Sequence, residues 1–243
     1  MSSPAAQLSV EVLSSSETPS KTNSHRWIDL VLVMGVAFGS PLLRSFYLAF
    51  HPEPLKYSNI RVVGGILAEA TAMLLFFVLF LRQRRRFADI GFGFRWTDLP
   101  KGLALILAAG GVMGLAYVCI NYAWFFMSLR SPYWFGSRMM FADVSIWLLV
   151  PFLVLNPFFE EILVRGYLTT ELIDLRGSVW LASFISLAVQ TSYHLYYGIA
   201  GALVVGCGLA VFAIYYARSR RLMPVITAHM IWDLTALLAA WHR

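Results

Sequence analysis

The chain has 243 residues, of which 59% are hydrophobic and only 13% are charged, and its mean hydropathy is +0.68. Soluble domains carry nearer a quarter charged residues, so this composition excludes an ordinary soluble protein. The formal net charge of +6 does not indicate a partner made of nucleic acid, because basic residues beside membrane spans account for it. Cys119 and Cys207 lie inside apolar runs, and we interpret them as packing residues rather than as part of a disulfide or metal framework.

In chain order, residues 1–24 come first; they are rich in Ser and Thr, and we predict a disordered N-terminal tail. Residues 25–243 are predicted to form one integral membrane domain, because apolar runs of about 20 residues recur along them. The predicted fold class is all-α, a polytopic bundle of about seven transmembrane helices. The seven spans are expected at about 27–50, 62–81, 102–126, 144–159, 179–197, 199–217 and 222–241.

Arginines gather in two of the turns between these spans. They are Arg82, Arg84, Arg85 and Arg86 after the second span, and Arg218, Arg220 and Arg221 after the sixth. Basic residues mark cytoplasmic loops, so we predict that both turns and the N-terminus face the cytoplasm. Glu69 and Arg44, which lie inside the first two spans, are interpreted as structural or snorkelling residues.

Two adjacent carboxylates, Glu160 and Glu161, follow the fourth apolar run. An ionised carboxylate is costly to bury in hydrocarbon, so ionisable residues in such a segment are functional candidates. On an α-helix Glu161 and Arg165 are i,i+4 neighbours and can pair, whereas Glu160 points about 100° away. We therefore favour a structural ion pair between Glu161 and Arg165, with a catalytic role for Glu161 as the alternative, and we expect Glu160 to face a polar cavity.

Three later residues can join the glutamates. His194 lies in the fifth predicted span, and His229 and Asp233 share one face of the seventh because they are i,i+4 neighbours. Side chains on facing helices of a bundle can converge on one site. A carboxylate and a histidine there could deprotonate a water for hydrolysis. Alternatively, Glu160, His194 and His229 could hold zinc or another divalent metal with water in the fourth position.

The expected span limits conflict with this site. They place Glu160 near the inner face and His194 near the outer end of its span, a mismatch of about 15 Å at the helical rise per residue. The site therefore requires that the fourth helix continue through Arg165 within the membrane, or that the fifth helix tilt or begin deeper than drawn.

The pattern of Glu160-Glu161-x-x-x-Arg165, a later His194 in an apolar helix, and a final His229-x-x-x-Asp233 resembles the CPBP (Abi) family. This family comprises the type II CAAX prenyl endopeptidases and the related bacteriocin-processing and self-immunity proteins. The resemblance covers about 146–236 and implies an intramembrane endopeptidase of mostly helices, either metal-dependent or glutamic. It also implies that Glu160 activates a water shared with His194, and that His229 and the residue four positions later supply the oxyanion site.

Two positions depart from the family pattern. Gln190 stands where the family usually has phenylalanine, and it could add a hydrogen bond inside the bundle. Asp233 stands where asparagine is frequent, and an ionised aspartate is a poor oxyanion donor. We therefore expect Asp233 to orient His229 or to bind a metal.

The resemblance implies an endopeptidase of the bacterial plasma membrane that hydrolyses a peptide bond near the membrane. Its expected partners are membrane lipid and a peptide or protein substrate, with either a prenylated CAAX-like tail or a leader peptide. The alternative is a non-catalytic scaffold or bacteriocin self-immunity protein on the same fold. A proton-coupled transporter that uses Glu160 and His194 as relays is disfavoured, because no inverted repeat is visible in the sequence.

Overall fold

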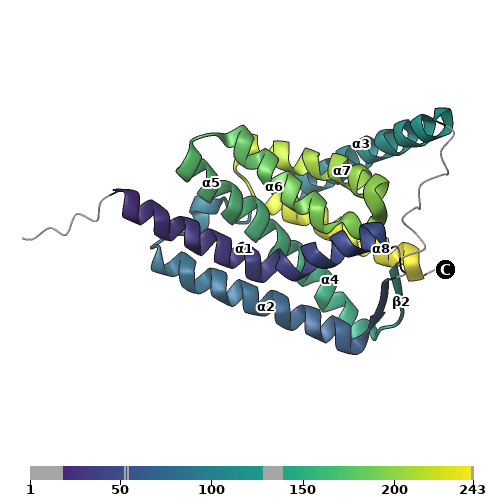
Figure 1. Cartoon of the computed structure of the whole chain (residues 1–243), viewed down its shortest axis with the longest axis horizontal. Helices are drawn as coiled ribbons and strands as arrows, with labels where there is room; N and C mark the ends of the chain where they lie inside the picture. Colours follow the sequence, from purple (N-terminus) through teal and green to yellow (C-terminus); the bar gives the residue numbers. More distant parts are fainter. Residues whose placement is uncertain (1–18, 52, 54, 128–138, 242–243) are drawn as a thin grey trace, which may run out of the picture.

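The computed structural model describes residues 19–51, 53, 55–127 and 139–241. Helices make up most of the described chain (Figure 1). They are α1 (Pro19–Phe50), α2 (Asn59–Arg82), α3 (Asp98–Phe126), α4 (Ile146–Glu160), the π-helical η3 (Glu161–Leu168), α5 (Thr169–Arg176), α6 (Val179–Tyr193), α7 (Gly198–Ser219) and α8 (Met223–Trp241). Short 3₁₀ turns, η1 (Phe87–Ile90) and η4 (Leu195–Tyr197), and two short strands, β1 (Leu55–Ser58) and β2 (Met139–Asp143), lie between them. The predicted all-α class is confirmed.

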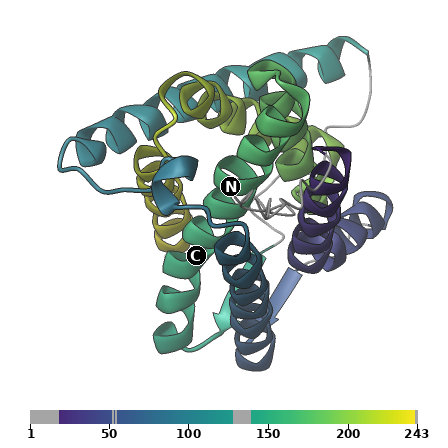
Figure 2. The same cartoon turned by 90° about the vertical axis from the view of Figure 1, so that its left-hand side faces the viewer.

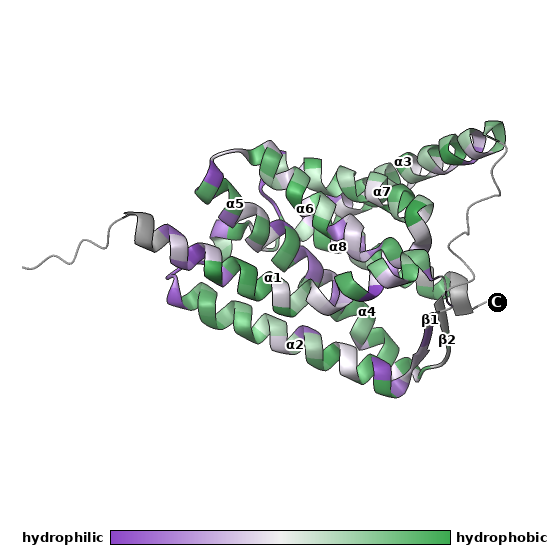
Figure 3. Cartoon of the chain, in the orientation of Figure 1, coloured by the Kyte–Doolittle hydropathy of each residue, from purple (hydrophilic) through white to green (hydrophobic). Residues whose placement is uncertain are grey.

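Helices occupy all seven predicted span positions, but in the described chain five helical segments are long and apolar enough to cross a membrane. These five are α1, α2, α3, the continuous segment from α4 to α5, and the segment from η4 to α7. Helix α6 is shorter than we expected, because it ends at Tyr193 and its 15 residues extend about 22 Å against a hydrocarbon core of about 30 Å. Figure 3 shows hydrophobic residues along the helices and hydrophilic ones near the ends of α1, α2 and α5.

The fourth span is much longer than predicted. Helices α4, η3 and α5 run without a break from Ile146 to Arg176, and every residue from 159 to 172 is buried. Seen from the end of the bundle, this segment crosses the middle of the molecule (Figure 2). The helix therefore continues through Arg165, which is the first of the two ways in which the predicted depth mismatch could be resolved.

The N-terminal part of the chain also differs from the prediction. Residues 1–18 of the expected tail lie outside the described residues, whereas 19–24 already belong to α1. The helix is fixed at this end by Arg26, which contacts Glu171 of α5 at 2.8 Å. Arg85, which follows α2, contacts the other oxygen of Glu171 at 2.8 Å. One buried carboxylate thus joins the ends of three helical segments.

At the opposite end of α1 and α2, the strands β1 and β2 pair in parallel. The ring of Tyr57 in β1 stacks on the ring of Phe141 in β2, with centroids 4.7 Å apart. This contact brings the segment that precedes α4 next to the start of α2. Both rings also line the cavity described below.

Candidate active site

A cavity of about 470 Å³ lies among α1, α2, α3, α4, α7 and α8, with Tyr193 and His194 contributing from the end of α6. Four predicted site residues line it together: Glu160, His194, His229 and Asp233. The depth mismatch expected from the sequence is therefore absent. Glu161 is fully buried behind the cavity wall and does not line it.

Three side chains donate hydrogen bonds to Glu160. Asn156, one helical turn earlier, reaches Oε1 at 3.3 Å. Gln190 Nε2 and the Tyr193 hydroxyl, both from α6, reach Oε2 at 3.3 Å and 2.5 Å. The ring of Tyr193 is in turn stacked on Phe38 of α1, with centroids 5.0 Å apart and planes at 9°. The Glu160 carboxylate is therefore fixed in orientation on the cavity wall.

Glu161 has more partners than the predicted ion pair. Its Oε2 lies 3.8 Å from Nε of Arg165, a distance too long for a hydrogen bond. Its Oε1 accepts from Gln190 at 3.1 Å and contacts Nδ1 of His229 at 2.9 Å. Glu161 therefore holds the histidine of α8 in addition to balancing the charge of Arg165.

The local backbone explains the loose pairing of Glu161 with Arg165. Both residues lie in η3, and a π-helix bonds i to i+5, so residues four apart no longer lie directly above one another. The Arg165 guanidinium reaches away from this helix, to the Ser186 hydroxyl at 2.9 Å and the Leu209 carbonyl at 3.3 Å. The Val164 carbonyl accepts from the same Ser186 hydroxyl at 3.0 Å. These side-chain hydrogen bonds connect η3 to α6 and α7. Short π-helical segments of this kind are frequent at functional sites.

His194 lies just after the last residue of α6. Its Nδ1 is 2.8 Å from the Gln190 carbonyl oxygen, which can only accept, so Nδ1 carries the proton. In the neutral ring Nε2 then keeps its lone pair. The rings of Tyr193, Tyr196 and Tyr197 surround the imidazole, with centroids 4.8, 5.8 and 6.0 Å away. His194 is therefore oriented as a hydrogen-bond acceptor.

His229 and Asp233 share one face of α8, as their spacing predicts. The expected orientation of His229 by Asp233 is not the geometry observed, because Nε2 and Oδ1 are 3.8 Å apart, which is beyond hydrogen-bonding distance. Glu161 supplies that contact instead. Asp233 Oδ2 accepts from Asn156 at 3.4 Å, so one amide links Asp233 to Glu160.

Several residues around the site were not identified from the sequence. Asn156 sits four residues before Glu160, a spacing that could have pointed to it, whereas Tyr193 carries no signal beyond its place beside His194. Glu69 and Arg44 were assigned structural roles, yet both line the cavity. Glu69 is 8% exposed, and its Oε2 has no hydrogen-bond partner among the described residues. Gln190 does form the hydrogen bonds that we expected of it.

The predicted metal ligands are Glu160, His194 and His229. Across residues 19–51, 53, 55–127 and 139–241, no three His, Cys, Asp or Glu side chains lie close enough together to hold a metal ion. Glu160 accepts three hydrogen bonds, and Nδ1 of His229 contacts Glu161. No step proposed below runs through a metal.

Carboxylates and imidazoles that meet in a cavity are the groups used in general acid–base catalysis. The fold and site thus define an integral membrane protein with a candidate hydrolytic centre among its helices. Residues 142–235 match the family model described as type II CAAX prenyl endopeptidase Rce1-like. This part of the chain is therefore similar to a protease family, and a protease family implies a peptide or protein substrate.

The matched segment runs from β2 to α8 and contains all the predicted site residues, in agreement with the resemblance over about 146–236. Comparisons with curated proteins and with solved structures gave no match. Helices α1, α2 and α3 lie outside the family match, although all three supply part of the cavity wall.

Proposed function

We propose that this protein is an intramembrane endopeptidase in which Glu160 and His194 activate a water molecule. The observation that carries the proposal is the placement of both side chains on one cavity, with Glu160 fixed by three donors and His194 presenting an acceptor nitrogen. Two acceptors on one wall can orient both protons of a water, which leaves its lone pair for attack.

The reaction proceeds in two steps. Glu160 takes a proton from the water, and the oxygen bonds to the carbonyl carbon of the peptide, which gives a tetrahedral oxyanion. Glu160 then returns the proton to the amide nitrogen as the carbon–nitrogen bond breaks. The products are a carboxylic acid and an amine, and the carboxylate of Glu160 is regenerated.

His229 is placed to stabilise the oxyanion. With Nδ1 directed at Glu161 (2.9 Å), the other ring nitrogen lies 3.8 Å from Oδ1 of Asp233, and both residues line the cavity with Glu160. In the protonated ring, Nε2 donates a hydrogen bond to the developing negative charge. Glu161 acts through His229 and is a positioning residue in this scheme.

The substrate is a peptide bond close to the membrane, in either a CAAX-like tail or a leader peptide. The family match and the largely apolar wall of the cavity, which includes Phe141, Phe152 and Leu153, support a peptide with apolar side chains beside the scissile bond. A prenylated substrate would leave its lipid chain among the surrounding lipids.

The test is cleavage of a membrane-anchored peptide library by detergent-purified protein, with wild type compared with Glu160→Gln and His194→Ala. We expect both variants to lose cleavage by about a hundredfold or more while they keep the wild-type thermal unfolding profile. The matched control is Glu171→Gln, another buried glutamate of the same segment that does not line the cavity. Cleavage by Glu160→Gln at the wild-type rate would refute the assignment.

The same preparations distinguish the alternatives. Stoichiometric zinc that is lost in His229→Ala, together with loss of cleavage, would favour a metal-bound site built from Glu160, His194 and His229. A folded wild type that cleaves none of the library while Glu160→Gln keeps its biological effect in cells would favour the scaffold or immunity protein. Flux linked to pH would favour the transporter.

A further inference from the structure

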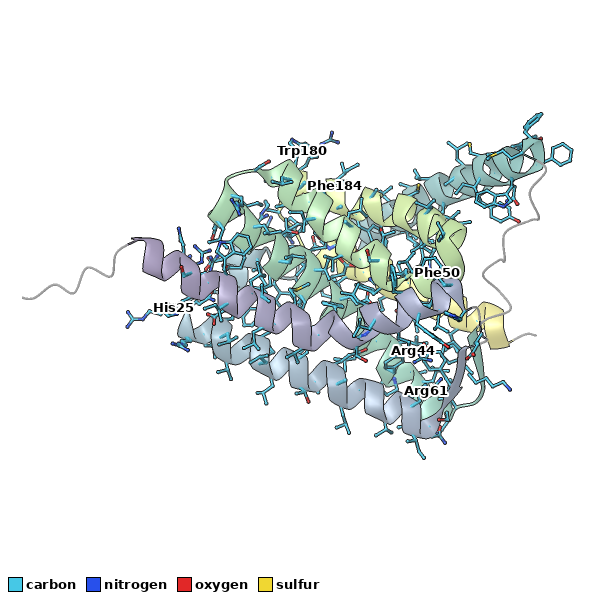
Figure 4. The ribbon with its side chains drawn as sticks, in the orientation of Figure 1. His25, Arg44, Phe50, Arg61, Trp180 and Phe184 are labelled. Carbon is cyan, nitrogen blue, oxygen red and sulfur yellow. The ribbon has the colours of Figure 1, made fainter. Side chains whose placement is uncertain are left out.

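Two arginines line the cavity that holds Glu160. Arg44 comes from α1 and Arg61 from the first turn of α2, and both are exposed. Among the described residues, no carboxylate lies within ion-pair distance of either guanidinium; Arg61 Nη1 donates to the Lys56 carbonyl at 2.6 Å. Figure 4 labels the two side chains near each other, at the end of the bundle where α2 begins. Most of their N–H donors therefore remain available.

The charges of Arg44 and Arg61 both act on the hydroxyl of Tyr57, which lines the same cavity. Burial raises the pKa of Tyr57; the two arginines oppose that increase, and the more weakly acting Asp233 and Glu69 add to it. Arg61 also lies in the first turn of α2, at the positive end of the helix dipole. This side of the cavity is thus electropositive.

The carboxylates of the cavity, on Glu160, Asp233 and Glu69, lie elsewhere on its wall, together with His194 and His229. An anionic group on a bound molecule would be attracted to Arg44 and Arg61, which have no carboxylate beside them in the part of the chain that the structure describes. The cavity can therefore orient a molecule that is negative at one end and apolar along its length.

One face of α2 connects the two regions. Arg61, Gly65, Ala68 and Glu69 all line the cavity, as their spacing on one side of a helix requires. Arg61 and Glu69 are eight residues apart in α2, which is about 12 Å along the axis. An extended peptide covers that distance in about three to four residues, so one short segment could reach from the arginines to the level of Glu160.

We propose that Arg44 and Arg61 bind the free C-terminal carboxylate of the peptide substrate and so place the bond to be cut beside Glu160. This inference rests on the proposed endopeptidase function. The C-terminal carboxylate is the negative group that a peptide with apolar side chains still carries. Guanidinium groups match it because they donate two parallel hydrogen bonds to a carboxylate.

The test uses two fluorescent peptides with a membrane anchor and apolar last residues, one ending in a free carboxylate and the other in an amide. Affinity is measured by anisotropy in the Glu160→Gln background, which prevents turnover. We expect the acid to bind about tenfold more tightly than the amide, and the ratio to fall toward one in Arg44→Gln/Arg61→Gln. Amide affinity should stay unchanged, and Arg44→Lys and Arg61→Lys should restore part of the preference.

The matched control is Lys56→Gln, which removes a positive charge on the same side of the molecule without changing a cavity residue. It should retain the tenfold ratio. Equal binding of acid and amide by the parent protein, or an unchanged ratio in the double arginine variant, would overturn the proposal. Loss of co-purified phospholipid in that variant with equal peptide affinities would also overturn it, and would assign the arginines to a lipid phosphate.

Cleavage of the same peptides by wild-type protein separates this inference from the proposed function. An acid preference in binding without cleavage of either peptide would refute the endopeptidase and leave the carboxylate site standing. Cleavage of acid and amide at equal kcat/KM would refute the carboxylate site and leave the endopeptidase standing.

Discussion

Replacing Arg165 with methionine tests the buried charge arrangement behind the cavity. Arg165 is 1% exposed, and its Nε lies 3.8 Å from the fully buried Glu161. At an effective dielectric constant of about 20, two unit charges at that separation attract by about 4 kcal/mol. Removal of one partner of a buried pair costs about 3–5 kcal/mol, because the other charge stays uncompensated. The Ser186 hydroxyl and Leu209 carbonyl also lose a donor.

For a chain of this length, about 4 kcal/mol corresponds to a fall of about 8–16 °C in the thermal midpoint. The assay is thermal unfolding of the detergent-purified protein, with a double-mutant cycle that combines Arg165→Met and Glu161→Gln. We expect the double variant to be more stable than the sum of the single changes implies, because it removes both charges together. Arg86→Met, at an exposed arginine (82%), is the control and should leave the midpoint unchanged. Additive effects in the cycle would refute the ion pair.

Two further substitutions separate chemistry from stability. Gln190→Leu removes the side-chain amide that donates to both Glu160 and Glu161. Hydrogen bonds to charged groups contribute about 1.5–3 kcal/mol, so we expect kcat to fall about tenfold or more with little change in KM. The measurement is steady-state cleavage of a library peptide. Glu171→Gln leaves Arg85 with one carboxylate partner fewer, and we expect a lower thermal midpoint with the kcat of the folded protein unchanged. A loss of kcat in Glu171→Gln without a change in midpoint would contradict this separation.

The sequence was sufficient to predict where the helices lie and that Glu160, His194, His229 and Asp233 meet. A long run of hydrophobic residues indicates a segment that is buried in membrane or protein. A charged residue inside such a run is easily recognised as a functional candidate. The limits of the fourth span could not be predicted in this way. Residues 161–176 include Glu161, Arg165, Glu171 and Asp174, which lower the local hydropathy. Residues 161–172 are nevertheless buried, and each of these four charges has a partner on another segment or in η3.

The roles of individual side chains were harder to predict, since they depend on contacts between helices. Spacing on one helix suggested that Asp233 orients His229 and that Arg165 pairs with Glu161. In the structure the contact to His229 comes from Glu161 of another segment, and the π-helical backbone of η3 moves Arg165 away from direct alignment. Arg44 and Glu69 looked structural because each is isolated in its own span, and only the packing of α1 and α2 against α4 brings them to one cavity.

Asp233 offers the sharpest test of how the oxyanion is stabilised. Since Glu161 already contacts His229 at 2.9 Å and Asp233 lies 3.8 Å from its other nitrogen, the carboxylate of Asp233 is not needed to hold the ring. Its negative charge opposes the oxyanion, whereas an amide at the same position could donate to it. We therefore expect Asp233→Asn to raise kcat, by about tenfold for a gain of about 1.4 kcal/mol in transition-state stabilisation.

The measurement is steady-state cleavage by Asp233→Asn and Asp233→Ala, with metal content determined on the same samples. The alanine variant removes the charge without adding a donor, so its kcat should fall below that of Asp233→Asn. The contact with Asn156 at 3.4 Å is available to an amide at position 233 as well, which keeps the Glu160 side of the site intact. A loss of kcat in Asp233→Asn, accompanied by loss of a stoichiometric metal, would instead show that the reaction requires the Asp233 carboxylate as a metal ligand and would refute its proposed dispensability for the oxyanion.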